Sequence, residues 1–228
     1  MLKATPAQAG FTLTEITVGL FIGAIILSST LYVFSSLSHS GNQSLSRSRL
    51  NQDITTLINI ISSDTRRAGY WNWTPELAIP LKNNPFMQQG WDISIDRYSA
   101  KEAQSSCITF SYDLDGDTLP GAKRVEQFGY RLRNKTIEMR TGGSSFNCQS
   151  GRWQRITQTS IDVTELSFSL NSYHINASQL DPELVCQTND LCLERRSLEI
   201  SIIAHNTGSA GNDFQLQKLI QIKNDKII

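Results

Sequence analysis

The chain has 228 residues, and its 21 Lys and Arg side chains are balanced by 21 Asp and Glu side chains. This balance gives no electrostatic case for nucleic acid, an anionic membrane surface or a polyanionic substrate as the main partner, although it leaves room for local charged patches. Once an N-terminal membrane and stalk helix is set aside, about 160 residues remain, which is enough for one ordinary globular domain and too few for two.

The first predicted element is an apolar helix. From Ile16 to Phe34 there is no charged residue, and at about 1.5 Å per residue this run gives roughly 28 Å of helix, close to the thickness of the bilayer hydrocarbon. Glu15 stands at its edge, where a carboxylate is costly to desolvate unless a cation pairs with it. A cut after Gly10 would supply that cation, since Phe11 would then carry a free α-amine four residues before the carboxylate.

The sequence Gly-Phe-Thr-Leu-Thr-Glu from Gly10 to Glu15, followed by an apolar helix, resembles the class III signal of type IV pilins and pseudopilins. An ordinary secretory signal places its apolar segment before the cleavage site, whereas here the apolar segment follows the glycine and would be kept. The resemblance implies that prepilin peptidase cuts after Gly10, that Phe11 is the cleaved and N-methylated residue, and that Glu15 is the carboxylate used in assembly. The alternative is an uncleaved N-terminal anchor with a stray glutamate near the interface.

Two glycines mark one face of the membrane half. Gly19 and Gly23 form a small-xxx-small pair, which would let another helix approach closely. The alternative is that glycine is simply common in membrane helices. No proline occurs between Phe11 and Thr74, so this helix is expected to continue into the one that follows. Major pilins often have a proline in the membrane half, and this sequence departs from them there.

The second half of the helix is predicted to be amphipathic. After a polar, serine-rich stretch at residues 35–48, apolar residues recur at three-and-four spacing, at Leu50, Ile54, Leu57, Ile58 and Ile61. The basic pair at 66–67 favours a helix C-terminus and Gly69 suits the residue after the last turn, so the helix is predicted to end near Ala68. The predicted segments are a leader at 1–10, a membrane half at 11–34, an amphipathic half at 35–68 and a globular domain at 69–228.

Strand signals fill the remainder of the chain. They occur at residues 107–112, 126–133, 136–140, 153–157, 163–170, 197–204 and 214–222. A short turn at Asn134 and Lys135 predicts a hairpin between the second and third of these. Short polar turns imply one antiparallel sheet, one face of which covers the apolar stripe of the helix. Segments 172–194 and 208–212 are expected to be surface excursions.

All four cysteines follow the membrane helix: Cys107, Cys148, Cys186 and Cys192. None forms a Cys-x-x-Cys pair, and the three histidines give no zinc-ligand spacing. If Lys3 keeps the leader in the cytoplasm, the rest of the chain crosses to an oxidising periplasm, where two disulfides are expected. Of the three pairings, Cys107 with Cys148 and Cys186 with Cys192 is favoured, because the second pair closes a short polar loop.

Few residues suggest a catalytic, metal-binding or nucleic-acid-binding role. Asp113, Asp115 and Asp117 put three carboxylates within five residues, which suits a hard cation such as calcium. The EF-hand pattern fails, because glycine stands at the fourth position and no glutamate at the twelfth, so a solvated acidic turn without a metal is preferred. Catalytic motifs are missing, so neither an enzyme nor a cofactor is predicted. The cluster around Trp153, at residues 152–155, could stack on single-stranded DNA, but an amphipathic strand is preferred and no direct contact with nucleic acid is predicted.

Three segments, at the end of the helix and in the globular domain, carry a more specific resemblance. Segments 66–71, 128–132 and 153–157 look like PilW-type minor pilins. This implies an α+β, type IV pilin-like fold, with a long N-terminal helix packed on an antiparallel β-sheet domain in the periplasm. It also implies a structural role, as a minor pilin held in the inner membrane and later in the fibre. Such a subunit joins other minor pilins and the major pilin near the tip and primes assembly on the inner-membrane platform.

Two other functions stay open. A J-type pseudopilin of type II secretion has the same architecture and processing, and it serves protein export instead. A membrane-anchored periplasmic binding module would require a site that the sequence does not reveal. In the minor-pilin case, twitching motility, adhesion or DNA uptake would depend on the chain indirectly.

Overall fold

The structure is a computed structural model that describes residues 10, 12–121, 126–143, 145–177, 186, 190–208 and 213–228. The chain divides into two compact units, Met1–Ser48 and Arg49–Ile228. The boundary falls at the end of the serine-rich stretch, inside the segment predicted to be the amphipathic half of the helix.

Helix α1 spans Leu13–Thr65. Its buried residues are the predicted stripe, Leu50, Ile54, Leu57, Ile58 and Ile61, together with Ser62 and Thr65. The stripe is therefore confirmed. The two hydroxyls can be buried because each donates to a carbonyl of the preceding turn, that of Ser62 to Ile58 and that of Thr65 to Ile61.

The end of α1 lies at Thr65, about one turn before the predicted position near Ala68. Beyond it the amides of Arg67 and Ala68 bond to carbonyls three residues back, which is the tighter pattern of a 3₁₀ turn. Gly69 has a φ of +73°, and its amide donates to the carbonyl of Ser111 at 2.8 Å. The glycine thus ends the helical segment as expected, but the turn before it has already tightened.

Two antiparallel sheets are present rather than the single sheet predicted. The first has the order β1-β2-β3-β4-β5, with β1 at Ser94–Asp96, β2 at Cys107–Ser111, β3 at Gln127–Arg133, β4 at Thr136–Gly142 and β5 at Arg152–Arg155. The second has the order β6-β7-β8, with β6 at Ile161–Asn176, β7 at Cys192–Asn206 and β8 at Phe214–Gln221; β9, at Lys226–Ile227, also pairs with β7. Two short 3₁₀ helices, η1 at Leu81–Asn83 and η2 at Pro85–Met87, precede β1.

Two hairpins bear on the predictions made from the sequence. Between β3 and β4, Asn134 and Lys135 have φ values of 49° and 60°, as the two central residues of a type I′ turn require. This predicted hairpin is confirmed. Strands β6 and β7 pair from Ile161 with Asn206 to Asn176 with Cys192, so part of the predicted excursion at 172–194 is strand. Residues 171–174 are exposed, so they pair through the backbone without an alternation of apolar and polar side chains. Because that alternation is the sequence sign of a strand, this part of β6 was not predicted.

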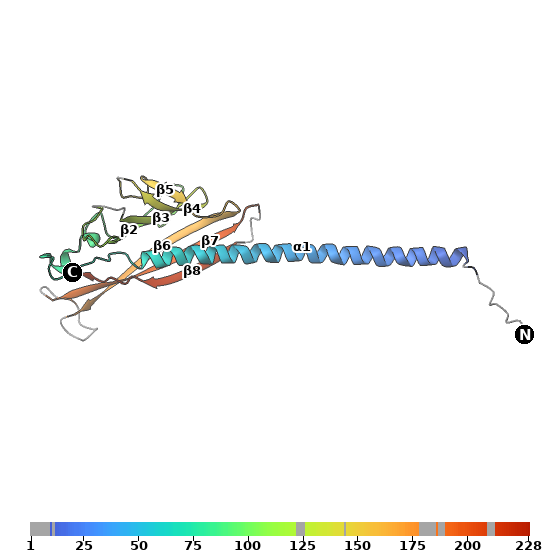
Figure 1. The fold of residues 1–228 in the computed structure, drawn as a ribbon, viewed down its shortest axis with the longest axis horizontal. Coiled ribbons are helices and arrows are strands. Elements are labelled where there is room, and N and C mark those ends of the chain that lie inside the picture. Colours follow the sequence, from blue (N-terminus) through green and yellow to red (C-terminus); the bar gives the residue numbers. More distant parts are fainter. Residues whose placement is uncertain are drawn as a thin grey trace, which may run out of the picture. The chain divides into compact units, whose positions relative to one another are not determined.

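One buried apolar cluster draws on α1 and on both sheets; among its members are Ile58, Phe110, Tyr130, Leu166 and Ile200. Figure 1 shows β2 to β5 and β6 to β8 as separate layers of this unit. The amide of Val163 on β6 donates to the carbonyl of Lys135 at 2.9 Å, which joins the two layers at one edge. The two sheets therefore share one core.

Two disulfides link the four cysteines, Cys107 with Cys148 and Cys186 with Cys192, the pairing favoured from the sequence. In each pair the Cα atoms are 6.1 Å apart. Cys107 begins β2, so the first disulfide fastens the connection between β4 and β5 to that strand.

Candidate functional site

The N-terminal end of α1 carries the residues predicted for processing and assembly. Gly10 is exposed and precedes the helix, whereas Phe11 lies outside the described residues. Thr12 donates to the carboxylate of Glu15 from its amide, at 2.9 Å, and from its hydroxyl, at 2.8 Å. The amide of Glu15 donates back to the Thr12 hydroxyl at 3.3 Å. This reciprocal capping box begins the helix at Leu13 and holds the carboxylate at the helix start.

The helix that follows is long and apolar enough to cross a membrane. Its most apolar 18-residue window has a mean hydropathy of 2.1, and none of that window is buried within the chain. Around Gly19 and Gly23 no atom, apart from the neighbouring backbone of the helix, lies within 4 Å of the place where a Cβ would stand. Both glycines could therefore admit a close helix partner, and that role stays a prediction.

The acidic turn after β2 is partly buried, which corrects the expectation of a solvated loop. Asp113 is 3% exposed, and Glu126, just before β3, is 1% exposed. One oxygen from each of four carboxylates lies within 4.8 Å of the others: Asp113, Asp115, Asp117 and Glu126. The sequence showed three of them. Glu126 was missed because it does not occupy the twelfth position of an EF-hand loop.

Backbone amides hold the two buried carboxylates. Asp113 accepts from three of them, those of Asn72, Gly116 and Thr118, at 3.1, 2.7 and 3.3 Å. Glu126 accepts from Leu114 at 2.8 Å and from Gly121 at 2.7 Å. Burial raises the pKa of Glu126, the two amide bonds lower it, and the charges of Asp113 and Asp115 raise it further. Four clustered carboxylates are donors that calcium prefers, so calcium binding stays open as the alternative. The preferred interpretation, a turn without a metal, stays a prediction.

A second polar cluster connects α1 to the first sheet. The carboxylate of Asp64 accepts the hydroxyl of Tyr112 at 2.9 Å and that of Tyr130 at 3.0 Å. Arg67 donates to the same carboxylate at 2.6 Å, and its guanidinium lies 4.5 Å from the centre of the Tyr112 ring. We call these four residues the Asp64 tether. Sequence reasoning overlooked it, although two tyrosines at inward strand positions are a sign that a buried partner is needed.

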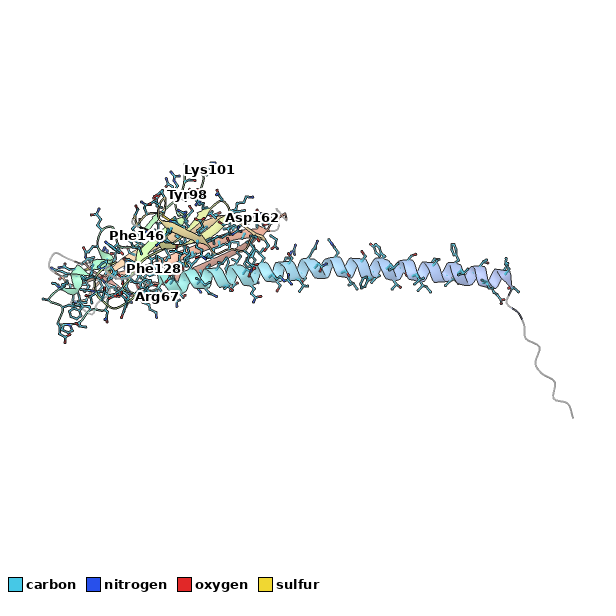
Figure 2. All side chains as sticks on the ribbon, turned by 45° about the horizontal axis from the view of Figure 1, so that its top comes forward. Arg67, Tyr98, Lys101, Phe128, Phe146 and Asp162 are labelled. Atoms are coloured by element: carbon cyan, nitrogen blue, oxygen red, sulfur yellow. A yellow bond between two sulfur atoms is a disulfide. The ribbon has the colours of Figure 1, made fainter. Side chains whose placement is uncertain are left out.

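Beside the Asp64 tether lies a groove of about 440 Å³. Its apolar lining includes Ile60 of α1, Phe128 of β3 and Met139 of β4. Phe128 stacks on Tyr112 with ring centroids 4.1 Å apart. Figure 2 shows Phe128 and Arg67 on the same flank of the globular unit. The groove thus offers an apolar surface next to an ordered polar cluster.

The basic and aromatic cluster on β5 has a structural explanation. The Trp153 ring lies 4.3 Å from the guanidinium of Arg131 on β3, and its N–H donates to the carbonyl of Ser150 at 2.8 Å. Arg131 in turn forms an ion pair with Glu138 at 2.7 Å. Trp153 is therefore part of the sheet surface, as the amphipathic-strand interpretation predicted.

Residues 43–222 match the family described as Prepilin peptidase-dependent protein B, and residues 5–31 match the prokaryotic N-terminal methylation motif. The first match covers well over half of the chain. The chain belongs to the prepilin peptidase-dependent protein B family. It is also 27% identical over 120 residues to Pilin-like protein PilA3 of Thermus thermophilus, an alignment that covers 49% of this chain and 52% of the relative. The chain thus spans about half the length of that relative. No solved structure matches.

As a member of the prepilin peptidase-dependent protein B family, the chain is a type IV pilin-like protein, and the predicted α+β fold with one long N-terminal helix is confirmed. The family match begins inside α1 and includes the Asp64 tether, the acidic turn and both disulfides. The methylation motif covers the capping box and the two glycines. The methylation motif thus covers the N-terminal segment, and the family match covers the later part of α1, from residue 43, and most of the globular unit.

Proposed function

We propose that this member of the prepilin peptidase-dependent protein B family is a minor pilin that primes assembly of a type IV pilus from a complex near the fibre tip. The observation that supports the proposal is the presence, on one chain, of the methylation motif at residues 5–31 and the family domain at residues 43–222. The partners are other minor pilins, the major pilin, prepilin peptidase and the inner-membrane assembly platform. Motility, adhesion or DNA uptake depends on the chain through the fibre.

Before assembly, the apolar half of α1 holds the chain in the inner membrane and the globular unit lies in the periplasm. The apolar window of α1 has the length and hydropathy for this role. Two disulfides suit an oxidising compartment. Lys3 and the rest of the short leader stay on the cytoplasmic side, where basic residues are favoured.

Cleavage after Gly10 gives Phe11 a free amine close to the carboxylate of Glu15. In the low dielectric of a bundle of apolar helices, this charge pair compensates two ions that would otherwise be costly to desolvate. The capping box with Thr12 keeps the Glu15 carboxylate at the helix start, within reach of an amine on this chain or on a neighbour. The open face at Gly19 and Gly23 lets a neighbouring helix approach.

Processing gives the first test. Mass spectrometry of the mature protein is expected to find an N-terminal peptide that begins at N-methylated Phe11. Gly10→Val should block cleavage and leave the leader attached, because the peptidase reads the glycine. Gly41→Ala, at another exposed glycine with open space around it, is the control and should be processed normally. A mature N-terminus at Met1, with the apolar segment intact, would contradict the proposal.

Deletion of the gene tests the priming role. Surface pili are expected to be abolished or sharply reduced, while the major pilin is still processed and stored in the inner membrane. Quantitative mass spectrometry of sheared wild-type pili should find only traces of this chain. Amounts equal to those of the major pilin would refute the priming role. Normal pili combined with loss of protein export would assign the chain to type II secretion as a pseudopilin.

A further inference from the structure

Two adjoining cavities lie where the C-terminal segment meets the connection that follows α1. The first, of about 260 Å³, is lined by residues of segments 69–87 and 223–227. The second, of about 390 Å³, is lined by Arg66, Arg195 and residues of segment 221–225. Lys223 and Asp225 line both, so the two cavities adjoin.

Cationic side chains gather at these cavities, although the chain as a whole has no net charge. Lys82, Lys223 and Lys226 line the first cavity, and Arg66 and Arg195 line the second. Among the described residues, the one carboxylate in either lining is that of Asp225, which pairs with Arg195 at 3.2 Å. A single carboxylate of the described chain therefore faces five cations across the two linings.

Some of these cations have no carboxylate partner among the described residues. Lys226 pairs with Asp92 at 2.8 Å, but Asp92 is shared with the buried Arg196. No carboxylate of the described residues lies within ion-pair distance of Lys82 or Lys223. A surface of this kind attracts a ligand that carries more than one negative charge.

Trp71 and Trp73 also line the first cavity. The indole N–H of Trp73 donates to the carbonyl of Ile79 at 2.8 Å, and that of Trp71 donates to Thr118 at 3.2 Å. These bonds fix both rings in place. Trp71 is only 8% exposed, whereas Trp73 is half-buried, so Trp73 offers most of the accessible aromatic surface. The Trp73 ring can therefore pack against the apolar C–H face of a compact ligand.

We propose that these cavities bind an acidic polysaccharide. One sugar ring occupies the first cavity against Trp73, with its carboxylate at Lys82 and Lys223. The next acidic group lies in the second cavity at Arg66 and Arg195. The first cavity is smaller than the roughly 300 Å³ at which cavities for drug-sized ligands begin, which suits one ring of a longer chain. This inference does not depend on the role in pilus priming.

Binding can be measured by titrating the full-length protein in detergent micelles with a tetragalacturonate. Its methyl ester, which lacks the charges, is the matched ligand control, and an oligothymidylate of equal charge tests nucleic acid. The acid form is expected to bind at least about tenfold more tightly than the ester, with an affinity that falls as salt rises. A stronger affinity for the oligothymidylate, or equal affinities for acid and ester, would overturn the proposal.

Two variants locate the site. Lys223→Gln and Lys82→Gln should each weaken binding of the tetragalacturonate by about tenfold, because each removes a cation without a counter-ion. Lys101→Gln makes the same change of charge at an exposed lysine that lines neither cavity (Figure 2), and it should leave affinity unchanged. Circular dichroism checks that each variant is folded. Equal weakening by Lys101→Gln, or unchanged affinity in both cavity variants, would show that the cavities are not the site.

Discussion

Replacing Cys107 and Cys148 together by alanine is expected to lower the free energy of unfolding by about 4 kcal/mol. The disulfide joins residues 41 positions apart, and a cross-link of that length removes much of the conformational freedom of the unfolded chain. Both cysteines are buried, and Arg131 donates to the carbonyl of Cys148 at 2.7 Å, so a hydrogen bond reinforces the attachment at the disulfide itself. Urea unfolding of the full chain in micelles, followed by near-ultraviolet circular dichroism, measures the loss.

The second disulfide is the matched control. Cys186 and Cys192 are separated by 6 positions, so the same double replacement there should lower the free energy of unfolding by only about 2 kcal/mol. The ratio of the two effects is the informative quantity, because the chemistry of the substitution is the same. Equal losses in the two double variants would show that the length of the closed loop does not govern stability here.

Asp64→Ala is expected to lower the free energy of unfolding by about 3 kcal/mol. The substitution leaves the hydroxyls of Tyr112 and Tyr130 without their acceptor in a place where these residues are 3% and 1% exposed. A buried donor without a partner is more costly than the loss of a hydrogen bond that water could replace. Adding Tyr112→Phe and Tyr130→Phe to Asp64→Ala should recover much of the loss, because the unsatisfied groups are then gone.

Asp53→Ala serves as the control on the same helix. Asp53 accepts a 3.2 Å bond from Gln158 near the surface, so this variant should lower the free energy of unfolding by less than about 0.5 kcal/mol. A loss as large as that of Asp64→Ala would mean that any carboxylate on this part of α1 matters equally. Persistence of the full loss in the triple variant would rule out unsatisfied hydroxyls as its cause.

The Asp64 tether also has an alkaline signature. Burial raises the pKa of Tyr112 and Tyr130 above the usual range, and the charge of Asp64 raises it further. In the unfolded chain both ionise at about pH 10, while the folded chain keeps their protons to higher pH. Their contribution is therefore complete below about pH 10 and is lost as pH rises above it. Replacing both Tyr112 and Tyr130 by phenylalanine removes the ionising groups and should make this alkaline decline less steep, which unfolding curves measured from about pH 9 to about pH 11 would show.

The sequence by itself determined the features that depend on near neighbours in the chain. The length of the uncharged run predicted the apolar half of α1, and the three-and-four spacing of apolar residues predicted the buried stripe from Leu50 to Ile61. The turn residues Asn134 and Lys135 predicted the hairpin of β3 and β4. The signal around Gly10 and Glu15 predicted a type IV pilin-like protein. These features can be inferred because each is set by residues within a few turns or one loop of each other.

Only the tertiary structure decided which distant side chains meet. Asp64 and Tyr130 are 66 positions apart. The periodicity of the sequence predicts which residues point inward, but it does not predict which distant residue each of them contacts. Glu126 joins the acidic turn because β2 and β3 pair in a register that brings their ends together. The division into two sheets and the cationic cavities arise in the same way, from the packing of segments far apart in the chain. Local patterns fix which face of an element is buried, but contacts between elements depend on the topology and register of the whole domain.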